Sequence, residues 1–214
     1  MDLITRNQGL QHISEEIFLN LDQPCLMYCQ KVNQFWKKIL NNPMFWLKKC
    51  VKMGLLKHYH LDWMKLIQSS KDPRIDKIIK SCLMNMHSES HADYSPIHAT
   101  FIHELENPTE LIRIAAPILD NPNSPFPTLA LAKKVLSGLG GDGVLQSSFP
   151  NWTPIQLVAY SRNTSSVEII GILAPLTEDP NAPDPDGWTP ISWAACKGNT
   201  EMTKHNTKLS NEII

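Results

Sequence analysis

The sequence predicts an all-α protein made of a small helical bundle, a helical linker and a short stack of repeated helix pairs. Apolar residues recur at helical spacing in the first part of the chain, as at Ile75, Ile79 and Cys82. Thirteen of the 16 prolines lie at or after Pro96, which marks a change of organisation near residues 88–92. Beyond that boundary the chain repeats itself at a fixed shift, and such a period indicates stacked repeats.

The repeat is visible when the sequence is shifted by 58 residues. Residues 95–125 then align with residues 153–183 without a gap, and ten of the 31 positions are identical. A further shift of 36 residues aligns Thr153-Pro154-Ile155 with Thr189-Pro190-Ile191. We therefore expect three helix-pair units, which begin near Ser95, Thr153 and Thr189.

The third unit shows what each repeat is built from. A tight turn is expected from Asp184 to Gly187, because glycine adopts a positive φ without steric cost. Thr189 then caps a helix that has Pro190 in its first turn, and Gly198 ends that helix. These residues resemble the ankyrin repeat, whose pattern is a Gly-containing turn, Thr-Pro-Leu-His, two alanines and a Gly before a second helix. The resemblance implies a short ankyrin-repeat solenoid over residues 91–205, which would bind another protein.

Two departures from the ankyrin pattern stand out. His98 keeps the histidine of the first unit, whereas Gln156 and Ser192 replace it in the other two. Extra residues between the first two units suggest an eroded repeat, with a helix over residues 129–136. The SGLGGDG segment that follows (137–143) mimics a phosphate-binding glycine pattern, but that pattern needs a strand before it and a helix after it. We interpret it as a helix end and a turn.

A large aromatic residue precedes the Ser/Thr-Pro step of each unit, at Tyr94, Trp152 and Trp188. In ankyrin repeats this position lies near the tip of a turn, so the resemblance makes these rings candidate anchors for a target protein. The alternative is that each ring packs on the next turn. The predicted partner-binding set is completed by residues expected on the same concave side: His103, Tyr160 and Lys197.

Residues 10–52 are expected to form a compact module of short helices. Apolar residues from Leu26 to Trp36 have the spacing of one helix, and Asn42-Pro43 breaks the helical pattern before Trp46. Three segments resemble the F-box: residues 13–17 at its start, 32–36 in its middle and 45–50 at its end. An F-box docks the small adaptor subunit of cullin–RING ubiquitin ligases. The adaptor-binding residues that the resemblance implies are Ile13, Ile17, Leu21, Pro24, Leu26 and Trp36.

The module departs from the F-box pattern in its first helix. Ser14 stands where the family has proline, and the segment from Ile17 to Asp22 is about one helical turn, or ~5.4 Å, short. Both departures predict weakened adaptor binding. Residues 53–90 are expected to be a helical linker, in which Asp72-Pro73 begins a helix with an apolar core face.

Composition narrows the possible functions. Residues 1–90 carry 13 Lys or Arg and 8 Asp or Glu, whereas residues 91–214 carry 7 and 13, so an overall basic nucleic-acid binder is not indicated. No apolar run approaches the ~20 residues of a membrane span, and the first residues lack the apolar core of a secretion signal. We therefore expect a cytoplasmic or nuclear protein without a membrane or nucleic-acid partner.

No catalytic, cofactor or metal site is expected from the sequence. The eight histidines form no His-Glu-x-x-His motif, and there is no Gly-x-Ser-x-Gly. The five cysteines are odd in number and are expected to be free, buried thiols, because Cys25 and Cys29 lack a second pair that would complete a zinc site.

The function that these features favour is substrate recognition in a cullin–RING ubiquitin ligase. The F-box-like module would bind the adaptor subunit, and the repeats would hold an unknown target protein. Two alternatives stay open: an ankyrin scaffold without ligase attachment, and a truncated or decayed repeat-protein product.

Overall fold

The computed structural model describes residues 3–86, 93–103, 108–127, 132, 135, 152–161 and 165–201, with side chains from Gly9 onward. Every regular element in these residues is a helix, which confirms the all-α prediction. The chain divides into two compact units, residues 1–93 and 94–214.

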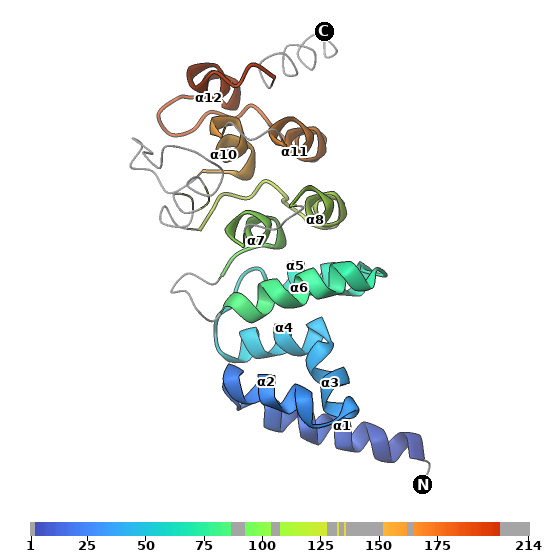
Figure 1. Ribbon diagram of the computed structural model, residues 1–214. Helices are drawn as coiled ribbons and strands as arrows, with labels where there is room; N and C mark the ends of the chain where they lie inside the picture. The colour runs from blue at the N-terminus through green and yellow to red at the C-terminus, as the bar shows by residue number, and fades with distance from the viewer. Residues whose placement is uncertain are drawn as a thin grey trace. The chain divides into compact units, whose positions relative to one another are not determined.

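The first unit holds six of the described helices (Figure 1). They are α1 (Leu3–Leu19), α2 (Gln23–Val32), α3 (Gln34–Asn41), α4 (Pro43–Lys52), α5 (His60–Ser69) and α6 (Pro73–Asn85). Four of them begin at a side chain that accepts a backbone N–H two or three residues ahead: Asp22, Asn33, Asn42 and Asp72. Such caps satisfy N–H groups that have no partner inside the helix, and each contributes about 1 kcal/mol. These four capping side chains therefore determine where the helices begin.

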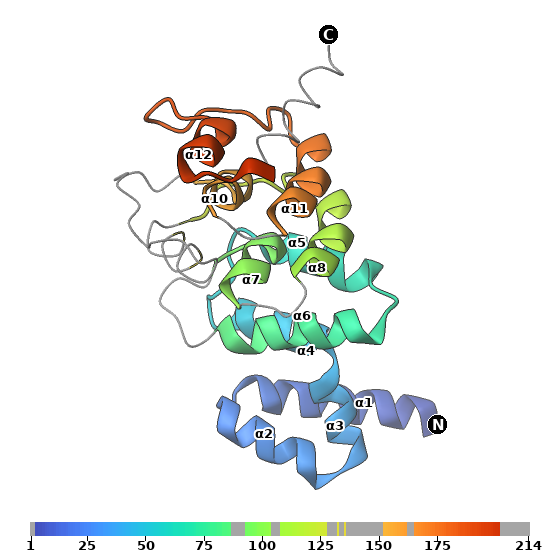
Figure 2. The ribbon, with the colours of Figure 1, turned by 45° about the horizontal axis from the view of Figure 1, so that its top comes forward.

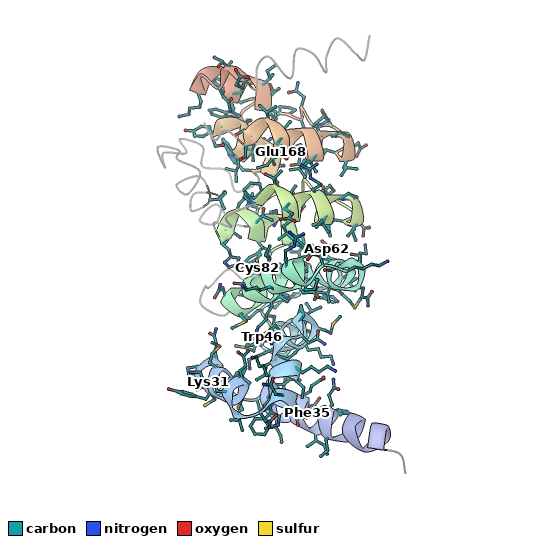
Figure 3. All side chains as sticks on the ribbon, turned by 45° about the vertical axis from the view of Figure 1, so that its right-hand side comes forward. Lys31, Phe35, Trp46, Asp62, Cys82 and Glu168 are labelled. Atoms are coloured by element: carbon teal, nitrogen blue, oxygen red, sulfur yellow. The ribbon has the colours of Figure 1, made fainter. Side chains whose placement is uncertain are left out.

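The core of the first unit contains a group of packed aromatic rings. Phe18 of α1 makes edge-to-face contacts with Trp36 and Phe45, with ring centroids 5.3 and 6.4 Å away. Trp46 is buried on α4, where its indole N–H donates to the Leu40 carbonyl at 2.8 Å. Figure 3 labels this residue together with Cys82, which is buried on α6. Residues 53–86 lie in the first compact unit, which spans residues 1–93, whereas the sequence predicted a separate linker over residues 53–90.

One expectation about the first unit is wrong. The single helix expected across Leu26 and Trp36 is two helices, because Asn33 is extended (φ −156°, ψ 165°) and its side chain caps α3. Apolar periodicity does not reveal this break, since both helices bury residues of the same kind. The first helix, α1, has 17 residues, runs through Ser14 and ends at Leu19. Serine, unlike proline, has a backbone N–H, so the helix continues there.

The second unit contains the repeated helix pairs. Its elements are α7 (Pro96–Ile102), α8 (Pro108–Ala115), η2 (Ala116–Ile118), α10 (Pro154–Tyr160), α11 (Ser166–Leu173), η3 (Ala174–Leu176) and α12 (Pro190–Lys197). Within this unit, α7 pairs with α8 and α10 with α11, α8 packs on α11, and α12 lies against α10 (Figures 1 and 2). Each pair alone leaves apolar residues uncovered, and stacking buries them.

One cap recurs at the three residues where the repeat units were predicted to start. Ser95, Thr153 and Thr189 each form a capping box with the residue three positions later, followed by proline in the first helical turn. Gly187 and Gly198 adopt φ values of 84° and 70°, as their turn and helix-end roles require. The repeat register read from the sequence is therefore the register of the helices.

The predicted eroded repeat lies mostly outside the described residues. Of its expected helix, only Ala132 and Val135 are described, and both are helical and buried. The SGLGGDG segment (137–143) falls entirely outside the described part of the chain.

Candidate functional site

The outer face of α1 carries a row of exposed apolar residues. Leu10, Ile13 and Ile17 are three and four residues apart, so they share one face of the helix. Ile13 is 59% exposed and Ile17 is 54% exposed, whereas Phe18 is buried in the core. Two of the residues predicted to bind the adaptor are therefore accessible and adjacent.

The other predicted adaptor-binding residues are divided between the interior and a pocket. Leu26 is fully buried, so its predicted role in adaptor contact is wrong: the turn of α2 toward α3 places it in the core. Trp36 is half-buried against Phe18. Leu21 and Pro24 line a pocket that α4 and α6 complete.

The second unit contains a cluster of four aromatic rings, contributed by Trp152, Tyr160, Trp188 and Trp193. The rings of Trp152, Tyr160 and Trp193 lie in mutual contact, with centroid separations of 5.3–5.5 Å. Trp188 stacks on Trp193, with centroids 4.8 Å apart and planes inclined by 25°. The cluster thus joins α10 and α12 and ends in an aromatic face at the surface.

Trp188 is held in place although it is 41% exposed. The buried carboxylate of Asp184 accepts the backbone N–H of Trp188 at 2.9 Å and that of Asp186 at 3.0 Å. Its second oxygen accepts the indole N–H of Trp193 at 2.9 Å. Asp184 therefore fixes both the turn and the ring on which Trp188 stacks. From the sequence, Asp184 was expected only to begin a turn.

Three residues of the predicted partner-binding set are buried, so their predicted roles as contacts are wrong. Trp152 and Tyr160 pack against each other and against Trp193, because the residue before the helix cap points toward the neighbouring helix. Tyr94 is buried as well, and its hydroxyl shares a hydrogen bond of 2.7 Å with His103 Nε2. For these two positions before a cap, the alternative of ring packing is confirmed.

The remaining members of that set keep partial access to solvent. His103 is half-buried beside Tyr94, and Lys197 is half-buried with its ammonium 4.1 Å from the centre of the Tyr160 ring. This cation–π contact shows that the aromatic cluster accommodates a positive charge at its edge. Trp188, His103 and Lys197 are thus the accessible part of the predicted set.

Other predicted features can be placed as well. Cys50 and Cys82 are buried free thiols, whereas Cys25 and Cys196 are exposed, so the expectation of burial is wrong for that pair. Within the described ranges, no group of three or more His, Cys, Asp or Glu is arranged to hold a metal ion. No described helix is both long and apolar enough to cross a membrane.

Comparison of the chain with protein-family models, curated proteins and solved structures finds no match.

Proposed function

We propose that this chain is a protein-interaction adaptor that recognises substrates for a cullin–RING ubiquitin ligase. In this proposal the first unit binds the adaptor subunit of the ligase, and the second unit, as a short ankyrin-like stack, binds the target protein. The chain itself carries out no catalysis, uses no cofactor and acts in the cytoplasm or nucleus.

The row Leu10, Ile13 and Ile17 is the observation that carries the ligase part of this proposal. Apolar side chains that share one helix face and stay exposed are typical of a docking surface. Ile13 and Ile17 are also the first two positions at which the F-box resemblance expects contact with the adaptor.

The exposed face of Trp188 supports the target-binding part. A tryptophan that is already fixed by stacking and by Asp184 loses little side-chain entropy on binding, and residues of this type often dominate interface energies. The same capping box recurs at the start of each helix after shifts of 58 and 36 residues, which supports an ankyrin-like stack.

Titration of the purified full chain with the purified ligase adaptor subunit tests the proposal. The double variant Ile13→Gln/Ile17→Gln keeps helix propensity and removes the apolar row, so it should weaken binding about tenfold or more. Leu61→Gln is the matched control: Leu61 is 50% exposed on α5 in the same unit and should have no effect. If the unmodified chain does not bind the adaptor at all, the ligase assignment fails.

One observation favours a second function, an ankyrin-like scaffold without ligase attachment. Ile13 and Ser14 lie inside the continuous helix α1, where the F-box pattern has Leu-Pro ahead of its first helix. In this case the full chain would capture a target through Trp188, and Trp188→Ala would reduce capture, while no adaptor subunit would bind.

A further inference from the structure

A half-open pocket of about 420 Å³ lies within the first unit, between the α1–α2 connection and helices α4 and α6. Its wall is mostly apolar. The side chains that provide this wall include Leu21, Pro24, Trp46, Met53, Leu55 and Met84. A volume of this size is in the range of sites that hold small molecules.

A single buried ammonium group also lines this pocket. Lys49 is 7% exposed, and its Nζ donates to the carbonyls of Leu19 at 3.3 Å and Leu21 at 2.6 Å. Leu19 is the last residue of α1 and Leu21 lies just after it, where carbonyl acceptors lack helical partners. Within the described part of the chain, the ammonium has no carboxylate in ion-pair distance. Burial lowers the pKa of Lys49, because a desolvated charge is unfavourable, and the charge of the nearby Asp22 carboxylate opposes this shift without cancelling it.

We propose that this pocket binds a linear amphipathic carboxylate of the fatty-acid class. The carboxylate head would accept the remaining N–H of the Lys49 ammonium, and the hydrocarbon chain would lie along the apolar wall beside Trp46. A charge-assisted hydrogen bond in surroundings of low dielectric is stronger than one in water. Ligand binding would supply a carboxylate in direct contact with the buried ammonium, which no described side chain provides.

Two neighbours of Lys49 narrow the chemistry of the ligand. Asp22 lines the pocket with an exposed carboxylate that accepts the backbone N–H of Cys25 at 2.9 Å. Its negative charge repels a doubly charged phosphate more strongly than a singly charged carboxylate. Cys50 also lines the wall, but burial raises its thiol pKa to about 12, and its Sγ donates to the Leu83 carbonyl at 3.3 Å. A protonated thiol is a poor nucleophile, so the ligand is held without a covalent bond.

Calorimetric titration of the full chain with decanoate, below its micelle concentration, tests this site. Decanol has the same chain without the charge, so we expect decanoate to bind about tenfold to a hundredfold more tightly. Lys49→Met keeps an apolar stem and should abolish that advantage. Lys52→Met is the matched control: Lys52 is exposed on the same helix, with its Nζ on Asn20 Oδ1, and the change should leave decanoate affinity unaltered.

A second variant keeps the test decisive if Lys49→Met fails to fold. Met53 lines the pocket and is 50% exposed, so Met53→Trp fills the entrance without disturbing the core. It should abolish decanoate binding in the same calorimetric titration. The proposal is overturned if decanoate does not bind, if decanol binds equally well, or if Met53→Trp binds decanoate as the unmodified chain does.

Discussion

His98 should make the stability of the second unit depend on pH. Its ring is fully buried: Nδ1 accepts the backbone N–H of Ser95 at 3.2 Å, so Nε2 carries the proton and donates to the Ser124 carbonyl at 2.8 Å. Burial lowers its pKa from 6.5 to about 4, although the bond to Ser124 acts in the opposite direction. Protonation would place a second N–H against the N–H of Ser95.

Proton linkage gives the direction and the size of the change in unfolding free energy that His98 causes. Because the folded-state pKa lies below the unfolded value, this contribution is fully present above pH 6.5 and is lost as the pH falls toward 4. The unfolded chain binds one more proton in that window, which costs ~1.4 kcal/mol per pH unit and about 2 kcal/mol by pH 5.

His98→Gln isolates this effect from other titrating groups. Gln156 occupies the equivalent position of the next unit, where Oε1 accepts the N–H of Thr153 at 3.0 Å and Nε2 donates to the Ala182 carbonyl at 3.3 Å. Glutamine should therefore keep both bonds at position 98 and remove the titration. Urea unfolding of both proteins, followed by circular dichroism from pH 7.5 to 4.5, measures the difference in unfolding free energy. A difference that stays constant across this range would refute the reasoning.

Two further substitutions test the packing and the backbone of the second unit. Trp152→Ala should cost about 3–5 kcal/mol, because it empties the centre of the aromatic cluster, whereas Trp188→Ala should cost much less because that ring is partly exposed. Trp152→Phe is the milder control, since the indole N–H of Trp152 finds no acceptor among the described residues. If urea unfolding showed the same loss of unfolding free energy for both alanine variants, the burial of Trp152 and the exposure of Trp188 would be contradicted. Gly198→Ala should cost about 1 kcal/mol through backbone strain alone, because φ is 70° and no atom lies within 4 Å of the added Cβ. A Tm unchanged from that of the unmodified chain would show that the helix does not end in this conformation.

Helix starts in the second unit could be predicted from sequence because their causes are local. A capping side chain, a proline and the residue three positions later all lie within one turn, as at Ser95 and His98. The same locality explains Asn42-Pro43 in the first unit. The break at Asn33 was missed because an asparagine in a helical pattern can face solvent or cap a new helix, and only tertiary packing decides between them.

Which residues of the candidate sites are buried and which are exposed depends on contacts between residues far apart in the sequence. Trp152 and Trp188 occupy equivalent repeat positions, yet one is buried and the other is 41% exposed. Their sequence context is the same Trp-Thr-Pro, so the difference arises from which helices lie beside each ring. The burial of Lys49 could not be predicted from sequence either, since it is one of several lysines on a short helix. Its side chain is buried because it contacts the carbonyls of Leu19 and Leu21.

The residues three positions after the caps, His98, Gln156 and Ser192, make different hydrogen bonds in the three units. His98 and Gln156 reach beyond their own caps to carbonyls of the following segment, at Ser124 and Ala182, and the two pairs are related by the same 58-residue shift. The hydroxyl of Ser192 donates to the Thr189 carbonyl of its own cap at 2.9 Å.

The third unit is held by other contacts in place of that long-range bond. Asn199 Nδ2 donates to the Ser161 carbonyl at 2.9 Å, and the Trp193 indole donates to Asp184. The bond to Asp184 and the stack under Trp188 share the ring of Trp193, so anchoring α12 and presenting Trp188 at the surface depend on one side chain. Trp193→Phe would keep the stack and lose the bond to Asp184. It therefore separates the contribution of the cluster to stability from its contribution to target binding.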